Sequence, residues 1–276
     1  MIIPHPARRP RCLWLAVGCL SVCVTVSSPS PASDTFTTGG VFIGQPAGWT
    51  PEQTPIDFLD IVGLQTKARW RQLYRAPPPT PSTDRPRAAF TLGGLVGDAF
   101  LALQAEDVQQ FRNTNQDILA YCRVLGLSEK VSPRLMAMAK LAEMNKWGDL
   151  RQDSVDGHQE LTRLLREQRD EDLAVLVDLG AWLRVLEISS TLVAIAPETT
   201  VKPLCVGSVE LLKDLKTRFA QMSKIAQQHE TLSQVGDALD YLIRNWSSPS
   251  NNPPSQEFVT KTNERLVNLM RKLTLK

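Results

Sequence analysis

The chain has 276 residues, of which 42% are hydrophobic and 22% are charged, a composition typical of globular proteins. This excludes a wholly disordered chain and a polytopic membrane protein, and the low share of glycine and proline excludes collagen-like sequence. The 31 basic and 29 acidic residues give a net charge of +2, so the overall charge does not point to nucleic acid as a partner.

The first 32 residues have the three parts of a secretory signal peptide. A basic start with three arginines and no acid is followed by an uncharged, mostly apolar stretch over 12–26. Small residues, Ser30 and Ala32, then stand at the −3 and −1 positions of a cut after Ala32. This order predicts a signal peptide over 1–32 and an exported protein, periplasmic or extracellular.

Two alternatives for this leader stay open. The apolar stretch could be an uncut N-terminal anchor, although it is shorter than the about 20 apolar residues that a membrane span needs. Residues 16–19 also resemble a bacterial lipobox, and a lipid on Cys19 would anchor the protein to the envelope. Without 1–32 the chain keeps 28 basic and 29 acidic residues, so binding of a polyanion has no support from composition.

Two cysteines remain after the leader, Cys122 and Cys205. In an exported protein they could form a disulfide. The alternative is that each is a separate buried thiol that packs as a small apolar side chain. The position of Cys122 on the apolar stripe of an expected helix favours this alternative.

Residues 33–87 are expected to form an extended N-terminal arm. Gly, Thr and Pro dominate 33–55, helical spacing predicts one amphipathic helix within 55–75, and 76–87 is a Pro-rich linker. The apolar groups of this arm make it the best candidate for partner binding, unless they pack back onto the rest of the chain. They are Trp49, Phe58, Trp70 and Tyr74.

From residue 88 to the end, apolar residues recur at helical spacing, and no useful run alternates with the period of a strand. We therefore expect one domain over 88–276, an all-α, antiparallel bundle of seven or eight helices with short connections. Residues 92–125 are either one long helix or two that break near Glu106. The next helix is expected to start at Ser132-Pro133 and to carry Leu135, Met138, Leu141 and Met144 as its apolar stripe. The expected segments that follow are 154–168, 170–194, 209–229, 232–246 and 259–273.

Three glycines indicate where two helices or a helix and a ligand approach closely. Gly93 and Gly97 are four residues apart on one helical face, and Gly180 lies in the most apolar segment, 173–188. Glycine inside a helix costs about 1 kcal/mol relative to alanine, so its presence favours close backbone approach. The spacing is not that of a dinucleotide-binding loop.

Charged residues near these glycines are candidates for a ligand site. If Arg184 faces the core it needs Asp98, Asp178 or Glu187 as a partner, because an unpaired buried charge is costly. The alternative is that Arg184 lies on a solvated flank. A pocket lined by Asp98, Trp182 and Arg184 would suit an anion.

No motif for catalysis, a metal or a cofactor is present: the sequence has no H-E-x-x-H, C-x-x-C, G-x-S-x-G or Walker A pattern. The leading hypothesis is a non-enzymatic interaction or structural protein of the bacterial envelope, with another envelope protein as its possible partner, no nucleic acid as a partner and no membrane span in the mature chain. The alternative is a periplasmic protein that binds a small ligand or anion between the Gly93/Gly97 face and the Gly180/Arg184 helix. An enzyme is a third option.

Overall fold

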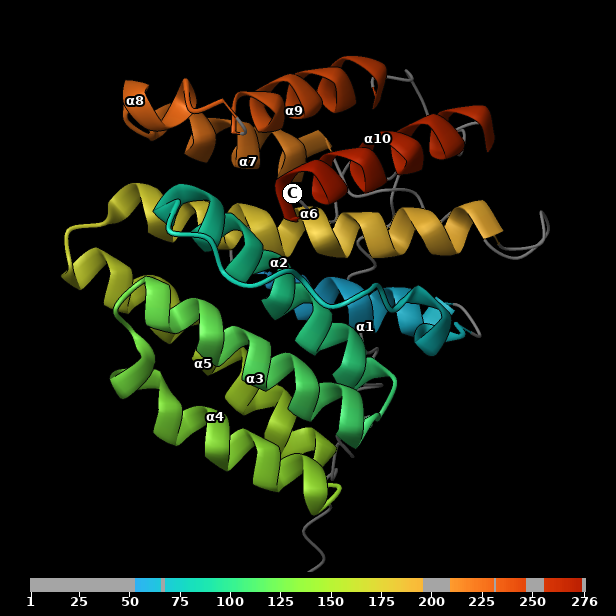
Figure 1. Cartoon of the computed structure of the whole chain (residues 1–276). Coiled ribbons are helices and arrows are strands. Elements are labelled where there is room, and N and C mark those ends of the chain that lie inside the picture. Colours follow the sequence, from blue (N-terminus) through green and yellow to red (C-terminus); the bar gives the residue numbers. More distant parts are fainter. Residues whose placement is uncertain (1–52, 66–67, 196–208, 231, 247–255, 275–276) are drawn as a thin grey trace, which may run out of the picture. The chain divides into compact units, whose positions relative to one another are not determined.

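The computed structural model describes residues 53–65, 68–195, 209–230, 232–246 and 256–274 (Figure 1). The chain divides into two units, Met1–Thr38 and Gly39–Lys276, and every described residue belongs to the second. Within these ranges all regular secondary structure is helical, which confirms the expected all-α class.

The described elements are ten α-helices and one short 3-10 helix. In chain order they are α1 (Pro55–Gln65), η1 (Trp70–Leu73), α2 (Arg85–Gln104), α3 (Val108–Val124), α4 (Ser128–Glu143), α5 (Trp147–Glu167), α6 (Glu171–Ile195), α7 (Val209–Gln221), α8 (Lys224–Gln227), α9 (Ser233–Trp246) and α10 (Gln256–Thr274).

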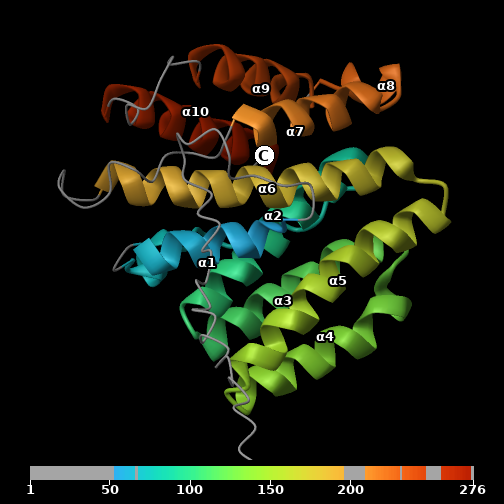
Figure 2. The same cartoon turned by 180° about the vertical axis from the view of Figure 1, so that it is seen from behind.

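Helices α2 and α6 form the centre of the packing. Both are buried nearly all round, as expected for helices without a distinct polar face. Helix α6 lies along α2 and also contacts α1, α5, α7 and α10. In both views it lies between α7, α9 and α10 on one side and α1 to α5 on the other (Figures 1 and 2).

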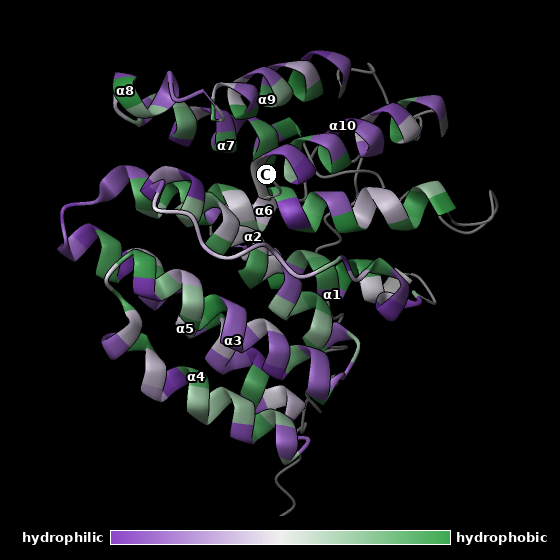
Figure 3. Cartoon of the chain, in the orientation of Figure 1, coloured by the Kyte–Doolittle hydropathy of each residue, from purple (hydrophilic) through white to green (hydrophobic). Residues whose placement is uncertain are grey.

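The peripheral helices are amphipathic and bury one stripe each. Helices α3, α4 and α5 pack in sequence order, with α3 against α2 and α5 against α6. On the other side, α7 and α10 pack on α6, and α9 packs on α7 and α10. Figure 3 shows how hydrophobic and hydrophilic residues are distributed along each helix.

The residues from α2 onward contain nine described helices, against the seven or eight expected. The break expected near Glu106 is present: Glu106 has φ +47°, and the side chain of Asp107 accepts a hydrogen bond from the Gln110 amide and caps α3. The segment 209–229 is not one helix, because α7 ends at Gln221 and the four-residue α8 follows.

The expected start of a helix at Ser132-Pro133 is wrong. Helix α4 begins at Ser128, so Pro133 lies inside it. The carbonyl that loses its donor to this proline belongs to Glu129, one turn earlier. Both residues are exposed, so this carbonyl can be hydrated, and the helix continues to Glu143.

The described part of the N-terminal arm packs against the other helices. In α1, Ile56, Phe58 and Leu59 are buried, and α1 contacts α2 and α6. The hydroxyl of Tyr121 donates to the carbonyl of Pro79 in the Pro-rich stretch. The described part of the arm therefore packs back onto the rest of the chain, which was the alternative to a free arm that binds a partner. The leader, Trp49 and the expected cleavage site lie outside the described residues.

Candidate functional site

The glycines of α2 and α6 face each other at backbone distance. A Cβ atom built on Gly93 would lie 2.1 Å from the carbonyl oxygen of Val177, and one on Gly180 would lie 2.2 Å from that of Phe90. No side chain fits at either position, so the missing side chains are what allow this approach. The close neighbour that the sequence indicates at this face is therefore a helix, and the two backbones fill the space between them.

Gly97, one turn along the same face, makes room for a side chain instead. A Cβ atom there would lie 2.8 Å from Cγ of Arg184. The aliphatic part of Arg184 therefore passes over Gly97 on its way to its partners.

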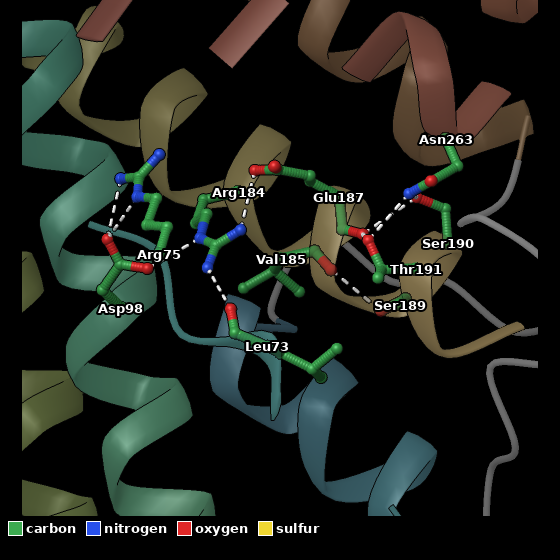
Figure 4. Close-up of polar contacts among 10 residues, drawn as sticks. All are labelled: Leu73, Arg75, Asp98, Arg184, Val185, Glu187, Ser189, Ser190, Thr191 and Asn263. Atoms are coloured by element: carbon green, nitrogen blue, oxygen red, sulfur yellow. Dashed lines mark hydrogen bonds and ion pairs between the residues drawn. The ribbon is translucent and has the colours of Figure 1, made fainter. Parts of the chain in front are cut away.

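Arg184 is buried, with 3% of its surface exposed, and three protein groups receive its donors (Figure 4). Its Nε donates to Oδ1 of Asp98 at 2.7 Å and its Nη1 to Oε2 of Glu187 at 2.8 Å. Its Nη2 donates to the carbonyl of Leu73 at 2.9 Å. Two of the three acids that the sequence offers to Arg184 are thus its partners.

Asp98 also pairs with a second arginine. Nε of Arg75 lies 2.8 Å and Nη2 of Arg75 lies 2.7 Å from Oδ2 of Asp98. We call Arg75, Asp98, Arg184 and Glu187 the buried ionic network; its formal charges sum to zero. Burial alone would lower the pKa of Arg184, but the carboxylates of Asp98 and Glu187 raise it above the ordinary value, so this guanidinium stays charged.

The network joins segments that are far apart in sequence. Leu73 and Arg75 follow α1, Asp98 is on α2, and Arg184 and Glu187 are on α6. Breaking a buried pair by removing one partner leaves an uncompensated charge. The network therefore fixes the segment around residues 73–75 against the central helix pair.

A second polar contact joins α6 to α10 beside this network (Figure 4). The amide nitrogen of Asn263 donates to Oγ of Ser190 at 3.0 Å and to Oγ1 of Thr191 at 2.7 Å. Both hydroxyls in turn donate to the carbonyl of Glu187. Helix α10 is thereby held at a defined position over the Glu187 turn of α6.

Trp182 lies on a different side of α6 from Arg184. Its ring is buried and meets the ring of Phe58 on α1 edge to face, with centroids 6.4 Å apart. Residues two apart on a helix do not face each other. The structure thus brings Asp98 and Arg184 together and directs Trp182 toward α1.

One edge of the buried ionic network borders a cavity of about 200 Å³ beneath α10. The residues that line this Arg75–Glu187 pocket are Arg75, Ala76, Pro78, Glu187, Val267, Met270 and Arg271. Nη1 of Arg75 and Oε1 of Glu187 have no partner among the described residues, and neither atom is buried. Sequence reasoning missed Arg75, which carries no signal beyond its place at the start of the Pro-rich linker.

The outward face of α4 is a second surface that the sequence did not reveal. Pro133, Met136, Ala137, Lys140 and Met144 are all exposed and recur at helical spacing, and we call them the α4 outer stripe. Met136 is 65% and Met144 is 49% exposed. Apart from Gly148, the exposed positions of the neighbouring α5 are instead polar or charged, among them Gln152, Asp156, Gln159 and Arg163.

The two histidines after the leader each contact one acid. Nε2 of His158 lies 3.1 Å from Oδ1 of Asp178, and Nε2 of His229 lies 3.2 Å from Oδ2 of Asp84. In the part of the chain that the structure describes, no three His, Cys, Asp or Glu side chains are grouped to hold a metal ion. Asp178 additionally faces Arg218 and Arg166.

The side chain of Cys122 is buried on α3, and burial raises the pKa of its thiol to about 12. Cys205, its expected disulfide partner, and Cys19, the expected lipidation site, lie outside the described residues. The disulfide and the lipid anchor therefore stay predictions.

Of the helices within the described ranges, none is both long and apolar enough to cross a bilayer. Comparison of the whole chain with protein-family models, with curated proteins and with solved structures finds no match.

Proposed function

We propose that this chain is a non-enzymatic interaction protein of the bacterial cell envelope, which docks a protein partner on the α4 outer stripe. The observation that supports this is the apolar character of the stripe. Four of its five side chains are apolar although all are exposed to solvent. Exposed apolar groups gathered on one face favour a binding surface, and methionine adapts its shape to a partner.

One lysine within the stripe and one near it indicate the chemistry of the partner. Lys130 and Lys140 are exposed on α4, and neither has an ion pair within the described residues. A helix that lays an apolar face along α4 and carries carboxylates on its flank would complement both features. We therefore propose an acidic, amphipathic helix of another envelope protein as the partner.

The cellular place of this function rests on the leader. A signal peptide over 1–32 would export the protein to the periplasm or the exterior, whereas a lipid on Cys19 would hold it at the envelope. Mass spectrometry of the mature N-terminus tests both, because cleavage after Ala32 leaves Ser33 as the first residue.

Site-specific photo-crosslinking in cells tests the docking. A photoreactive residue at position 136 or 140 should crosslink to one protein, and the same probe at Gln152 or Gln159 of α5 should not. Met144→Glu should abolish the crosslink from position 136, and the crosslinked peptide should be an acidic amphipathic segment. A crosslink to a second copy of this chain, or one that Met144→Glu leaves unchanged, would contradict the proposal.

A second candidate function is binding of a small ligand, as an alternative or in addition. The observation that favours it is the Arg75–Glu187 pocket, where one guanidinium nitrogen and one carboxylate oxygen are left without protein partners among the described residues. The site would then lie beside the buried ionic network instead of between the glycine faces of α2 and α6.

A further inference from the structure

We propose that the Arg75–Glu187 pocket binds a small zwitterion with an apolar body, of the amino-acid class. This inference rests on the second candidate function and names its ligand; it does not depend on the α4 outer stripe.

The walls of the pocket set the size and the body of the ligand. The stretch that follows α1 contributes Ala76 and Pro78, and α10 contributes Val267 and Met270. These side chains are apolar, and the cavity of about 200 Å³ is smaller than the about 300–1,000 Å³ of pockets for drug-sized ligands. The pocket therefore suits a compact ligand whose bulk is a short apolar group.

Two guanidinium groups can receive a carboxylate. Nε and Nη2 of Arg75 contact Asp98, whereas its Nη1 has no partner among the described residues. Arg271 lines the same pocket, and its one hydrogen bond in the described residues goes to Asn268 on its own helix. Hydrogen bonds between a guanidinium and a carboxylate are among the strongest in proteins, so these two side chains define the anionic end of the ligand.

The carboxylate of Glu187 defines the cationic end. Its Oε2 is held by Arg184, while Oε1 has no partner among the described residues. A ligand with a carboxylate alone would leave this oxygen, on a side chain that is 10% exposed, without a donor and would be repelled by it. A ligand with an amine alone would meet Arg75 and Arg271, so only a ligand with both groups satisfies the whole pocket.

These groups are held in place before any ligand binds. Asp98 orients Arg75, and Arg184 orients Glu187. A Cβ atom on Gly94 would lie 2.9 Å from Nη2 of Arg75 and 3.2 Å from Cε of Met270, so this glycine lets both side chains lie close to α2. Preorganised groups lose little conformational freedom on binding.

Calorimetry with three matched probes tests the ligand class. L-Leucine carries both charged groups, 4-methylpentanoate lacks the amine, and isopentylamine lacks the carboxylate. We expect leucine to bind the purified protein at least ten times more tightly than either analogue. Equal affinity for leucine and 4-methylpentanoate, or binding of none of the three, would overturn the proposal.

Variants on α10 locate the site without touching the buried ionic network. Val267→Trp should fill the mouth of the pocket and abolish binding of leucine. Glu257→Trp, on an exposed position of the same helix nearly three turns before Val267, is the matched control and should bind as the wild type does. Binding that survives Val267→Trp would place the ligand elsewhere and refute the pocket.

Charge-removing variants assign the two ends of the ligand. Arg271→Gln should weaken leucine and 4-methylpentanoate to a similar extent, while Glu187→Gln should weaken leucine at least tenfold and leave 4-methylpentanoate as it was or bound more tightly. Circular dichroism checks that each variant is folded. Met144→Glu on α4 should leave leucine binding unchanged, so that failure of the pocket and failure of the docking surface are separate outcomes.

Discussion

Asp98 and Arg184 are 86 positions apart in the chain, yet Nε of Arg184 donates to Oδ1 of Asp98 at 2.7 Å. The other carboxylate oxygen of Asp98 faces Arg75. One acid therefore compensates two arginines, of which Arg184 is almost without contact to water. This arrangement makes Asp98 the residue on which the stability of the buried ionic network depends most.

Asp98→Asn should destabilise the protein by about 3–5 kcal/mol, the cost of removing one partner of a buried ion pair. The amide keeps the shape of the side chain but leaves Arg184 with only one carboxylate partner, Glu187. The measurement is the free energy of unfolding in urea. Asp149→Asn is the control, because Asp149 is exposed and 3.9 Å from Lys146, and exposed pairs contribute about 1 kcal/mol or less. Equal stability of the two variants would refute the role of Asp98.

Gly180→Ala should destabilise the protein by about 1–3 kcal/mol or more, since overpacking forces the helices apart. The new Cβ atom would meet the carbonyl oxygen of Phe90, which belongs to a backbone that cannot rotate away. Gly148→Ala is the matched control: it also lies in a helix, but nothing lies within 4 Å of its added Cβ. That variant should be neutral or more stable by about 0.5–1 kcal/mol. Thermal unfolding of both variants, compared with the wild type, checks the difference.

The helical periodicity of the sequence predicts the all-α fold and most helices, because each amphipathic stripe is a local property of about four turns. The glycines of α2 and α6 also give a signal, since an unfavourable residue in a helix implies a close neighbour. The sequence also limits the partners of Arg184 to a few nearby acids, because a buried arginine needs a carboxylate. The apolar segment 173–188 thus predicts the central helix and, because it contains Arg184, a carboxylate that pairs with this arginine.

The sequence could not reveal the pocket or the α4 outer stripe, because both depend on which face of each helix another helix covers. The periodicity assigns Leu135, Met138, Leu141 and Met144 to one apolar stripe. The structure buries Met138 but leaves Met144 exposed just after the end of α4, where neither α3 nor α5 covers it. Arg75 likewise acquires its role only when α1 folds back on α2.

Asp178 should make the stability of the protein depend on pH in the acid range. Burial raises the pKa of its carboxyl, but His158, Arg218 and Arg166 outweigh this and lower the pKa below the ordinary value of 3.8. A carboxyl whose pKa is lower in the folded state stabilises the protein above the pKa of the unfolded state, and this contribution is lost as the pH falls through the folded value. Asp178→Asn should therefore be less stable than the wild type at pH 6.

The difference in unfolding free energy between the wild type and Asp178→Asn should narrow from about pH 4 downward. Asp178 is then protonated, and the wild type loses the stabilisation that its carboxylate provides. Urea unfolding between pH 6 and pH 2 measures it. Asp149→Asn, which removes an exposed carboxyl 3.9 Å from Lys146, is the matched control for the loss of a carboxyl outside the core. A constant difference across this range would show that Asp178 acts through packing and not through its charge.

Cys122 should react with a thiol reagent only when the protein unfolds. Its pKa of about 12 leaves almost no thiolate at neutral pH, and its side chain is buried on α3; the thiolate is the reactive form. Alkylation followed by peptide mass spectrometry should therefore find Cys122 unmodified in the native protein and modified in urea without a reductant. If Cys122 reacts in urea only after reduction, it is bridged, and the two cysteines that remain after the leader form the disulfide that an exported protein can contain.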